Sequence, residues 1–203
     1  MAKQPRGKIV RHLGINIYGN PKYDKLLDRK PNTPGKERGN KSRAKVSVYG
    51  EQLKEKQKFR FAYGMSERQF RNLYKNASRM SGATGDNMIS LMERRFDNTI
   101  YRMGFAISRA QARQMVSHGY FYINGKLANI PSMYIKAGDV ITTREKKGIE
   151  SLIRKNLSAT TSKKGNWIEL DDQKLSAKIV VLPQSTDIQP VGKIQSVVEF
   201  YSK

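Results

Sequence analysis

The sequence predicts an α+β fold made of four consecutive parts. They are a basic N-terminal arm (residues 1–45), a helical N-terminal domain (46–86), a small module of two helices packed on a short, mostly antiparallel sheet (87–158), and a strand-containing C-terminal extension (159–203). Three observations support this class. Apolar residues recur every three or four positions in two central stretches, an Asn-Gly pair separates two short apolar runs, and the beginning of the chain is basic and rich in Gly, Pro and Asn.

The N-terminal arm is expected to lack a core of its own. Residues 1–45 include 13 basic and 3 acidic side chains. The few apolar residues among them are too sparse to offset the entropy that a chain loses when it becomes ordered. We therefore expect this arm to become ordered against a partner, and a flexible, solubilising tail is the alternative.

Two helices are predicted in the helical N-terminal domain. The first runs from Tyr49 to Tyr63 and ends at Gly64, and a capping box of Ser66 and Gln69 begins the second. One side of the second helix is apolar and carries Phe70, Leu73, Ala77 and Met80. The nearly opposite side is basic and carries Arg68, Arg71, Lys75 and Arg79. Such a helix can bury one face and lay the other on phosphates, and a merely solvated face is the alternative.

The small module should begin with one continuous helix. Its apolar stripe is formed by Ile89, Met92, Phe96, Ile100 and Met103, and Gly104 can end it. Arg95, Asn98 and Arg102 are expected on the face away from this stripe.

A second helix and a hairpin follow in the module. Ser108 and Gln111 form a capping box, so the helix begins at about Arg109, sets Arg109 and Arg113 on one face, and reaches Gly119. The runs 121–123 and 126–128 flank Asn124-Gly125, which predicts a type I′ hairpin because both turn residues need a positive φ. A last strand is expected over 140–143.

The C-terminal extension should contain more strands than helices. Residues 151–157 predict a short helix, and 167–170, 179–182 and 197–201 predict strands, with Trp167 as a packing anchor. Their pairing remains open. We expect the first strand to extend the sheet of the module and the last to return toward the N-terminal helices.

The overall charge points to a polyanionic partner. The formal net charge is +22, from 39 basic and 17 acidic residues, and such an excess favours nucleic acid or an acidic membrane surface. No apolar run approaches the roughly 20 residues of a spanning helix, and the start lacks the apolar core of a signal peptide, so no membrane is expected. The absence of Cys excludes disulfides and cysteine-based zinc sites. The cytoplasm is the simplest compartment.

Several stretches together resemble the RNA-binding module of the S-four family of small-subunit ribosomal proteins. They read ERRFDN (93–98), YRMGF (101–105), SRAQARQ (108–114), SHG (117–119) and INGK (123–126). The resemblance to the bacterial type of this family extends to YGEQLKEKQK (49–58), ERQFRN (67–72) and VEFYSK (198–203). Some members carry an N-terminal set of zinc-binding cysteines, which this cysteine-free chain lacks.

This resemblance implies a structural protein of the ribosome, in the cytoplasm, with no cofactor and no small-molecule substrate. It implies binding to small-subunit ribosomal RNA early in assembly, nucleation of the subunit body, and contacts with neighbouring ribosomal proteins that affect translational accuracy. It also implies that arm residues, here Arg43 and Lys45, line the path of incoming messenger RNA. The arm itself is then expected to become ordered against RNA.

The candidate RNA-binding residues of the module are mostly arginines. Phosphates are expected to be bound by Arg94, Arg95, Arg102, Arg109, Arg113 and Lys126, with assistance from Asn98 and Asn124. His118 is interpreted as a helix-terminal or RNA-facing residue. The basic face of 68–79 extends this footprint. Acidic residues scattered among the arginines favour ion pairs over carboxyl groups with a raised pKa.

Enzymatic alternatives find little support in the sequence. Only His12 and His118 could act as histidine bases or ligands, so no metal site is expected, and neither a phosphate-binding Gly-rich loop nor a Gly-x-Ser-x-Gly motif is present. Similar modules are appended to RNA-modifying enzymes such as pseudouridine synthases, but no remaining segment is large enough for a catalytic domain. The alternatives are an RNA-binding translational regulator, a fragment of an RNA-modifying enzyme and a general DNA-binding protein. The DNA-binding protein is disfavoured because the module resembles domains that recognise the shape of RNA.

Overall fold

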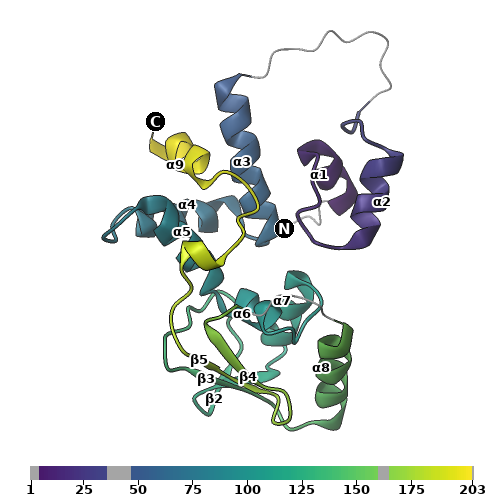
Figure 1. The fold of residues 1–203 in the computed structure, drawn as a ribbon, viewed down its shortest axis with the longest axis vertical. Coiled ribbons are helices and arrows are strands. Elements are labelled where there is room, and N and C mark those ends of the chain that lie inside the picture. Colours follow the sequence, from purple (N-terminus) through teal and green to yellow (C-terminus); the bar gives the residue numbers. More distant parts are fainter. Residues whose placement is uncertain (1–4, 36–46, 160–164, 203) are drawn as a thin grey trace. The chain divides into compact units, whose positions relative to one another are not determined.

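The computed structural model describes residues 5–35, 47–159 and 165–202, so the candidate residues Arg43 and Lys45 lie outside the described residues. Helices and one five-stranded antiparallel sheet make up the described part of the chain, which confirms the predicted α+β class (Figure 1). Two compact units can be distinguished, one formed by residues 1–65 and 191–203 and the other by 66–190. The second unit therefore combines the predicted module with one helix before it and two strands after it.

The first unit begins with two short helices, α1 (Arg6–Leu13) and α2 (Pro21–Arg29). They pack against each other and bury Val10, Leu13 and Tyr23, while Ile17 of the connecting turn is buried beside them. The prediction that the arm has too few apolar residues to become ordered is thus wrong for residues 5–35. Each helix is too short for an apolar period to stand out in the sequence, but a pair of them buries a common core.

The longer helices of this unit are α3 (Val48–Ala62) and α9 (Ile194–Ser202), which pack against each other. The α3 helix was predicted, and Gly64 follows it with φ +63°. The strand predicted over 197–201 is wrong, because these residues belong to α9. Its β-branched and aromatic residues favour a strand by themselves, but packing against α3 decides the outcome. The ring of Phe200 lies 5.4 Å from that of Tyr49, and the amide of Gln52 donates to Glu199 at 3.0 Å. The expected return of the C-terminal end toward the N-terminal helices is confirmed.

The second unit contains five of the described α-helices. These are α4 (Glu67–Ala77), α5 (Thr84–Glu93), α6 (Phe96–Arg102), α7 (Arg109–Ser117) and α8 (Lys147–Ala159). The capping box predicted before α4 is present, with Ser66 and Gln69 each accepting from the other's backbone N–H. Before α7, Ser108 accepts from Gln111 as expected, but the Gln111 side chain accepts from the N–H of Ile107 instead. Met80 is exposed rather than buried, since α4 ends at Ala77.

The single helix predicted through the first part of the module is wrong, because the chain breaks between α5 and α6. Arg95 has an extended backbone with ψ 136°. Residues 131–135 provide the hydrogen-bond partners at the break. The N–H of Phe96 donates to the carbonyl of Met133 at 2.8 Å, and the N–H of Asp97 donates to the carbonyl of Pro131 at 3.1 Å. In the other direction, the N–H of Ile135 donates to the carbonyl of Arg94 at 3.0 Å. The predicted apolar residues on both sides of the break are nevertheless buried.

The sheet has the strand order β2-β1-β3-β5-β4. Its strands are β1 (Phe121–Ile123), β2 (Lys126–Ala128), β3 (Val140–Thr143), β4 (Ile168–Asp171) and β5 (Ser176–Ile179). Asn124 and Gly125 connect β1 and β2 with φ +49° and +76°, as the predicted hairpin requires. The C-terminal extension does extend this sheet, but β5 rather than β4 pairs with β3. Residues 180–182, predicted as strand, lie beyond the end of β5.

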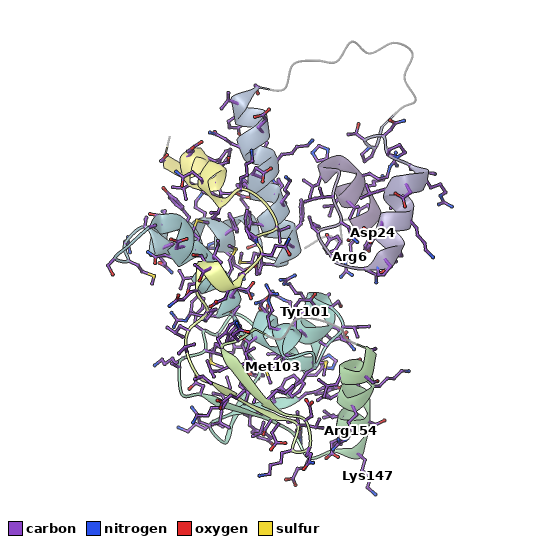
Figure 2. The ribbon with its side chains drawn as sticks, in the orientation of Figure 1. Arg6, Asp24, Tyr101, Met103, Lys147 and Arg154 are labelled. Atoms are coloured by element: carbon purple, nitrogen blue, oxygen red, sulfur yellow. The ribbon has the colours of Figure 1, made fainter. Side chains whose placement is uncertain are left out.

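One apolar core holds the helices and the sheet of this unit together. It includes Phe96 of α6, Val116 of α7, Phe121 of β1, Ile153 of α8 and Trp167 at the start of the C-terminal hairpin. Trp167 is almost completely buried, which confirms its role as a packing anchor. Arg154, labelled on α8 in Figure 2, donates to the backbone carbonyl of Gln173 and so ties this helix to the turn between β4 and β5. The core fixes α6 and α7, which carry most of the candidate site residues.

Candidate nucleic-acid interface

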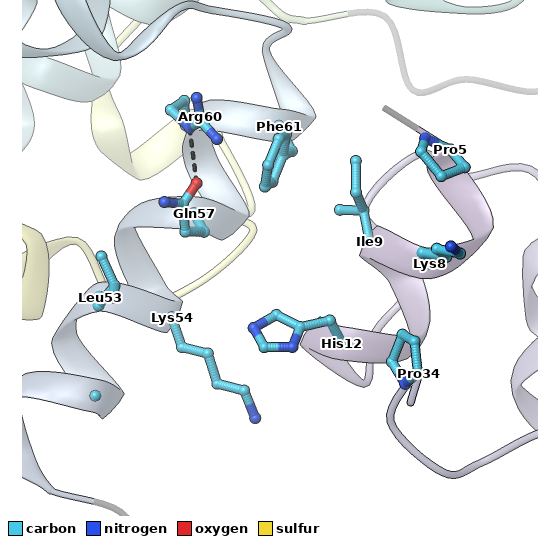
Figure 3. Close-up of a pocket in the computed structure, with 11 residues that line it drawn as sticks. Pro5, Lys8, Ile9, His12, Pro34, Leu53, Lys54, Gln57, Arg60 and Phe61 are labelled. Carbon is cyan, nitrogen blue, oxygen red and sulfur yellow. Dashed lines mark hydrogen bonds between the residues drawn. The ribbon is translucent and has the colours of Figure 1, made fainter. Parts of the chain in front are cut away.

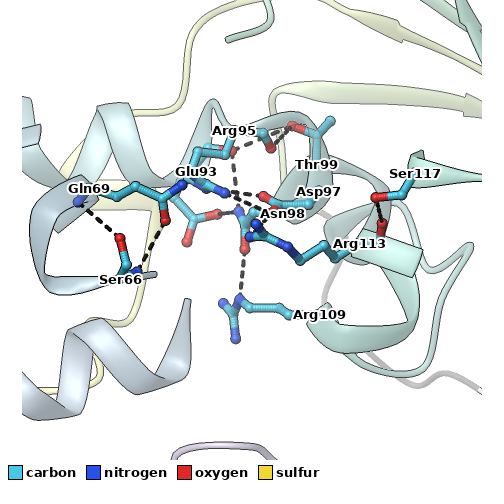
Figure 4. Close-up of polar contacts among 10 residues, drawn as sticks. All are labelled: Ser66, Gln69, Glu93, Arg95, Asp97, Asn98, Thr99, Arg109, Arg113 and Ser117. Carbon is cyan, nitrogen blue, oxygen red and sulfur yellow. Dashed lines mark hydrogen bonds and ion pairs between the residues drawn. The ribbon is translucent and has the colours of Figure 1, made fainter. Parts of the chain in front are cut away.

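Two buried carboxylates lie at the centre of the arginine cluster on α6 and α7 (Figure 4). Glu93 is the last residue of α5, and Asp97 lies in the first turn of α6; their exposed fractions are 0% and 3%. Asp97 accepts two hydrogen bonds from the guanidinium of Arg95, from Nε at 3.1 Å and from Nη2 at 2.7 Å. Both partners of this ion pair are buried.

Glu93 holds a second group of side chains. Its carboxylate accepts two hydrogen bonds from Arg102, at 2.8 Å from Nε and 2.7 Å from Nη2, and a third from the amide of Asn98 at 2.7 Å. The amide oxygen of Asn98 in turn accepts from Nε of Arg109 at 2.7 Å. The guanidinium of Arg109 also lies 4.6 Å from the ring centre of Tyr101, in a cation–π contact.

Arg113 and Arg94 complete the cluster at its edges. Nη1 of Arg113 donates to Asp97 at 3.3 Å, and 42% of the Arg113 side chain is exposed. Nε of Arg94 donates to the carbonyl of Ile135 at 3.2 Å, and its guanidinium lies near the ring of Tyr134. Arg102 remains partly exposed, with 25% of its side chain accessible. Arg94, Arg102, Arg109 and Arg113 are thus anchored and accessible at the same time.

The expectation that Arg95 and Asn98 lie on an outer face is wrong. Both are buried, because the break before α6 turns Arg95 onto Asp97 and places Asn98 between Glu93 and Arg109. These two side chains therefore support the surface from below. The general expectation of ion pairs among the arginines is confirmed by both carboxylates.

The hairpin tip carries the remaining candidates of the module. The amide of Asn124 donates to Asp139 at 2.9 Å, and its oxygen accepts from the N–H of Val140, so this side chain fastens the turn to β3. Lys126 is exposed at the start of β2. His118 follows α7 as its C-cap, is exposed, and lies edge-on to the ring of Tyr120.

The basic side of α4 is exposed as predicted. Phe70, Leu73 and Ala77 are buried on its other side. The four basic side chains Arg68, Arg71, Lys75 and Arg79 are all exposed. The α4 helix packs against α5, whose last residue is Glu93, so both basic groups belong to one compact unit.

Sequence reasoning missed three residues of this site, namely Glu93, Asp97 and Tyr101. The signal for the two acids was their place on either side of Arg94-Arg95, within a strongly basic stretch. Their burial could not be inferred, since it depends on the break in the helix.

Other features of the described chain offer little for chemistry. A pocket of about 510 Å³ in the first unit is lined by residues of α1 and α3 (Figure 3). His12 lies on its wall, but none of its described lining residues is acidic. The described residues contain no group of three or more His, Asp or Glu side chains placed to hold a metal ion. None of the described helices is long and apolar enough to cross a membrane.

Comparison with known families defines the class of protein. Residues 94–141 match the family model "S4 domain", and residues 1–93 match "Ribosomal protein S4/S9 N-terminal domain". The boundary between these two models falls at the break between α5 and α6. The arginine cluster on α6 and α7 therefore lies in the S4 domain, in a protein that combines this domain with a ribosomal N-terminal domain.

Similar proteins from spirochaetes cover the whole chain. The proteins named small ribosomal subunit protein uS4 from Treponema denticola and Treponema pallidum strain Nichols are 74% and 68% identical over 201 residues, 99% of this chain and 98% of each relative. The protein of that name from Borrelia hermsii is 50% identical over 200 residues, 98% of this chain and 96% of the relative. The chain belongs to the uS4 family of small ribosomal subunit proteins.

Proposed function

We propose that this chain is a structural constituent of the small ribosomal subunit that binds ribosomal RNA through α4, α6, α7 and the β1–β2 hairpin. The observation that carries the proposal is the set of partly exposed guanidinium groups of Arg102, Arg109 and Arg113, held in fixed places by buried partners. Fixed guanidinium groups suit a folded polyanion whose phosphates are themselves fixed in space. The names of the relatives agree with this role.

The basic face of α4 adds long-range attraction. Its four exposed cations and Lys126 can contact phosphates of any RNA backbone, which raises affinity for RNA of any sequence. Arg95 and Asn98 support the neighbouring arginines instead of touching RNA. His118 and Asn124 lie at the exposed margins of the same unit and are proposed as secondary contacts.

The salt dependence of RNA binding tests this proposal. If about eight phosphates are neutralised, the logarithm of the affinity for purified small-subunit ribosomal RNA should fall with the logarithm of salt concentration at a slope of roughly −6 to −7. Replacing Arg109 and Arg113 together by Ala should reduce the slope by about 1.5 to 2 and leave the chain folded. A slope near −2 for the natural chain would show that the interface lies elsewhere.

The matched control replaces two other exposed cations of the same unit. Lys147 and Lys155 lie on α8 and are both exposed. Their joint replacement by Ala removes the same charge as the Arg109 and Arg113 variant, so a specific interface predicts a clearly smaller loss of affinity. Equal losses in the two double variants would indicate that only net charge matters.

The wider roles implied by the family are part of the same proposal. They are nucleation of the subunit body, contacts with neighbouring ribosomal proteins that affect accuracy, residence on cytoplasmic ribosomes, and a path for messenger RNA lined by Arg43 and Lys45. We also infer a structural rather than catalytic protein, since the relatives that match along almost their whole length are named as ribosomal proteins. The division at residues 45, 86 and 158 remains a prediction about domain organisation.

A further inference from the structure

Two acids at the centre of a surface that binds a polyanion need an explanation. Each carboxylate lowers the positive potential of that surface, and so acts against the attraction of phosphates. Their burial gives no clear gain in stability either, because a buried ion pair contributes little compared with apolar residues of similar volume. Glu93 and Asp97 therefore call for a role in RNA binding itself.

We propose that Glu93 and Asp97 are positioning residues, which fix the guanidinium groups of Arg102, Arg109 and Arg113 for the spaced phosphates of one folded RNA. The inference rests on the proposed function of the chain and deepens it. Glu93 acts on Arg102 directly and on Arg109 through Asn98. Asp97 acts on Arg113, while its bidentate bond with the buried Arg95 holds the carboxylate itself in place.

Anchoring of this kind changes the entropy of binding. A long, free side chain loses rotamer freedom when it meets a phosphate, and that loss weakens the complex. Arg102 and Arg109 are already restricted through Nε in the free protein, and Arg113 through Nη1. Because the carboxylates are themselves buried, their positions are set by the core and not by the RNA.

Anchoring also favours one arrangement of phosphates over others. The contrast is with α4, where Arg68 and Arg71 are exposed and, among the described residues, make no side-chain hydrogen bond or ion pair. Mobile cations can contact the phosphates of any RNA strand, whereas fixed cations bind more tightly to an RNA whose phosphates match their positions. The two groups of arginines thus have different roles. Those of α4 raise the affinity for any RNA, and those of α6 and α7 provide selectivity for one RNA fold.

The variant Asp97→Asn separates positioning from simple charge. It removes one negative charge, so attraction alone predicts tighter binding to every RNA. The positioning role predicts the opposite for small-subunit ribosomal RNA, a loss of roughly three- to tenfold for each arginine released. Binding to single-stranded poly(U) should stay equal or become slightly tighter. The control Asp86→Asn removes an exposed acid of the same unit and should not weaken binding to either RNA.

A double-mutant cycle adds a readout that a purely structural role would leave unchanged. In the natural chain Arg113→Ala should weaken binding to ribosomal RNA several-fold, but in the Asp97→Asn background it should cost less than about twofold. Additive losses, or ribosomal RNA binding by Asp97→Asn that equals or exceeds that of the natural chain, overturn the inference. If the natural chain does not prefer ribosomal RNA to poly(U), the proposed function fails with it. If that preference is present but Asp97→Asn binds every RNA more tightly, as loss of a negative charge alone predicts, only the positioning role is refuted.

A measurement on the natural chain decides the matter even if Asp97→Asn does not fold. Nuclear magnetic resonance relaxation of arginine Nε–H groups in the full, RNA-free chain should give order parameters above about 0.6 for Arg102 and Arg109 and below that value for Arg68 and Arg71. Equally low values for the two pairs would overturn the inference.

Discussion

Phe96 offers the sharpest test of how the candidate interface is held in place. It is the first residue of α6, is completely buried, and meets the ring of Phe121 edge to face at 6.1 Å between centroids. Asp97, which anchors Arg95 and Arg113, follows it directly. The change Phe96→Ala therefore removes packing immediately beneath the arginine cluster while leaving every charge in the chain intact.

The expected loss of stability is large. Burial of a Phe side chain removes roughly 150–250 Å² from water, and at about 25 cal/mol per Å² most of that contribution disappears with the ring. Large-to-small changes of this type cost about 3–5 kcal/mol, since the remaining cavity is only partly filled by its neighbours. In a unit that spans residues 66–190, this corresponds to a fall in melting temperature of roughly 10–20 °C.

Fluorescence of Trp167 provides the assay. It is the single Trp of the chain and belongs to the same buried cluster as Phe96, so its emission reports unfolding of this core. Ile107→Ala serves as the control, because Ile107 is 58% exposed in the same unit and its truncation should change stability by less than about 0.5 kcal/mol. A shift below about 2 °C for Phe96→Ala would refute the assignment of Phe96 to the core.

Three further predictions concern individual elements. Gly125→Ala should destabilise the chain by about 1 kcal/mol in urea unfolding, because Gly125 has φ +76°, which Ala adopts only with strain. Gly148→Ala is the control: Gly148 has no positive φ and open space around it, so this change should be neutral or stabilising. Ser66→Ala should cost about 1 kcal/mol through loss of the α4 capping box, and an unchanged urea midpoint would argue against that cap. Burial raises the pKa of Tyr18 above its usual 10.0, with Arg6 opposing the shift. Folding thus favours the protonated phenol of Tyr18. The stability that this preference contributes is fully present below the pKa of Tyr18 in the unfolded chain and is lost as pH rises through the raised pKa of the folded chain. Tyr18→Phe should therefore weaken the loss of stability seen in unfolding experiments between pH 9 and 12.

Local signals in the sequence predicted the parts of the fold that depend on neighbouring residues. The capping box of Ser66 and Gln69, the glycine after α3 and the Asn124-Gly125 turn each follow from a few adjacent side chains and their backbone preferences. The apolar stripe from Ile89 to Met103 was also identified correctly, since all five of its residues are buried.

Features that depend on distant partners could not be predicted in this way. The break at Arg94 and Arg95 is stabilised by residues 131–135, and α9 packs against α3, which lies far away in the sequence. The burial of Arg95 follows from the break, because only then can it reach Asp97. The sequence therefore predicted α7, the hairpin and the exposure of many candidate cations, but not the break before α6 or the burial of the two acids.

The break between α5 and α6 has a consequence for how the protein acquires its binding surface during synthesis. Chains grow from the N-terminus, so the cationic residues 94–113 emerge before Pro131, Met133 and Ile135, whose backbones hold the break in shape. A nascent chain shorter than this already carries these cations but lacks the backbone partners that hold the break and the start of α6. The fixed arrangement of these side chains is thus acquired only when the segment that follows the hairpin folds back onto the start of α6.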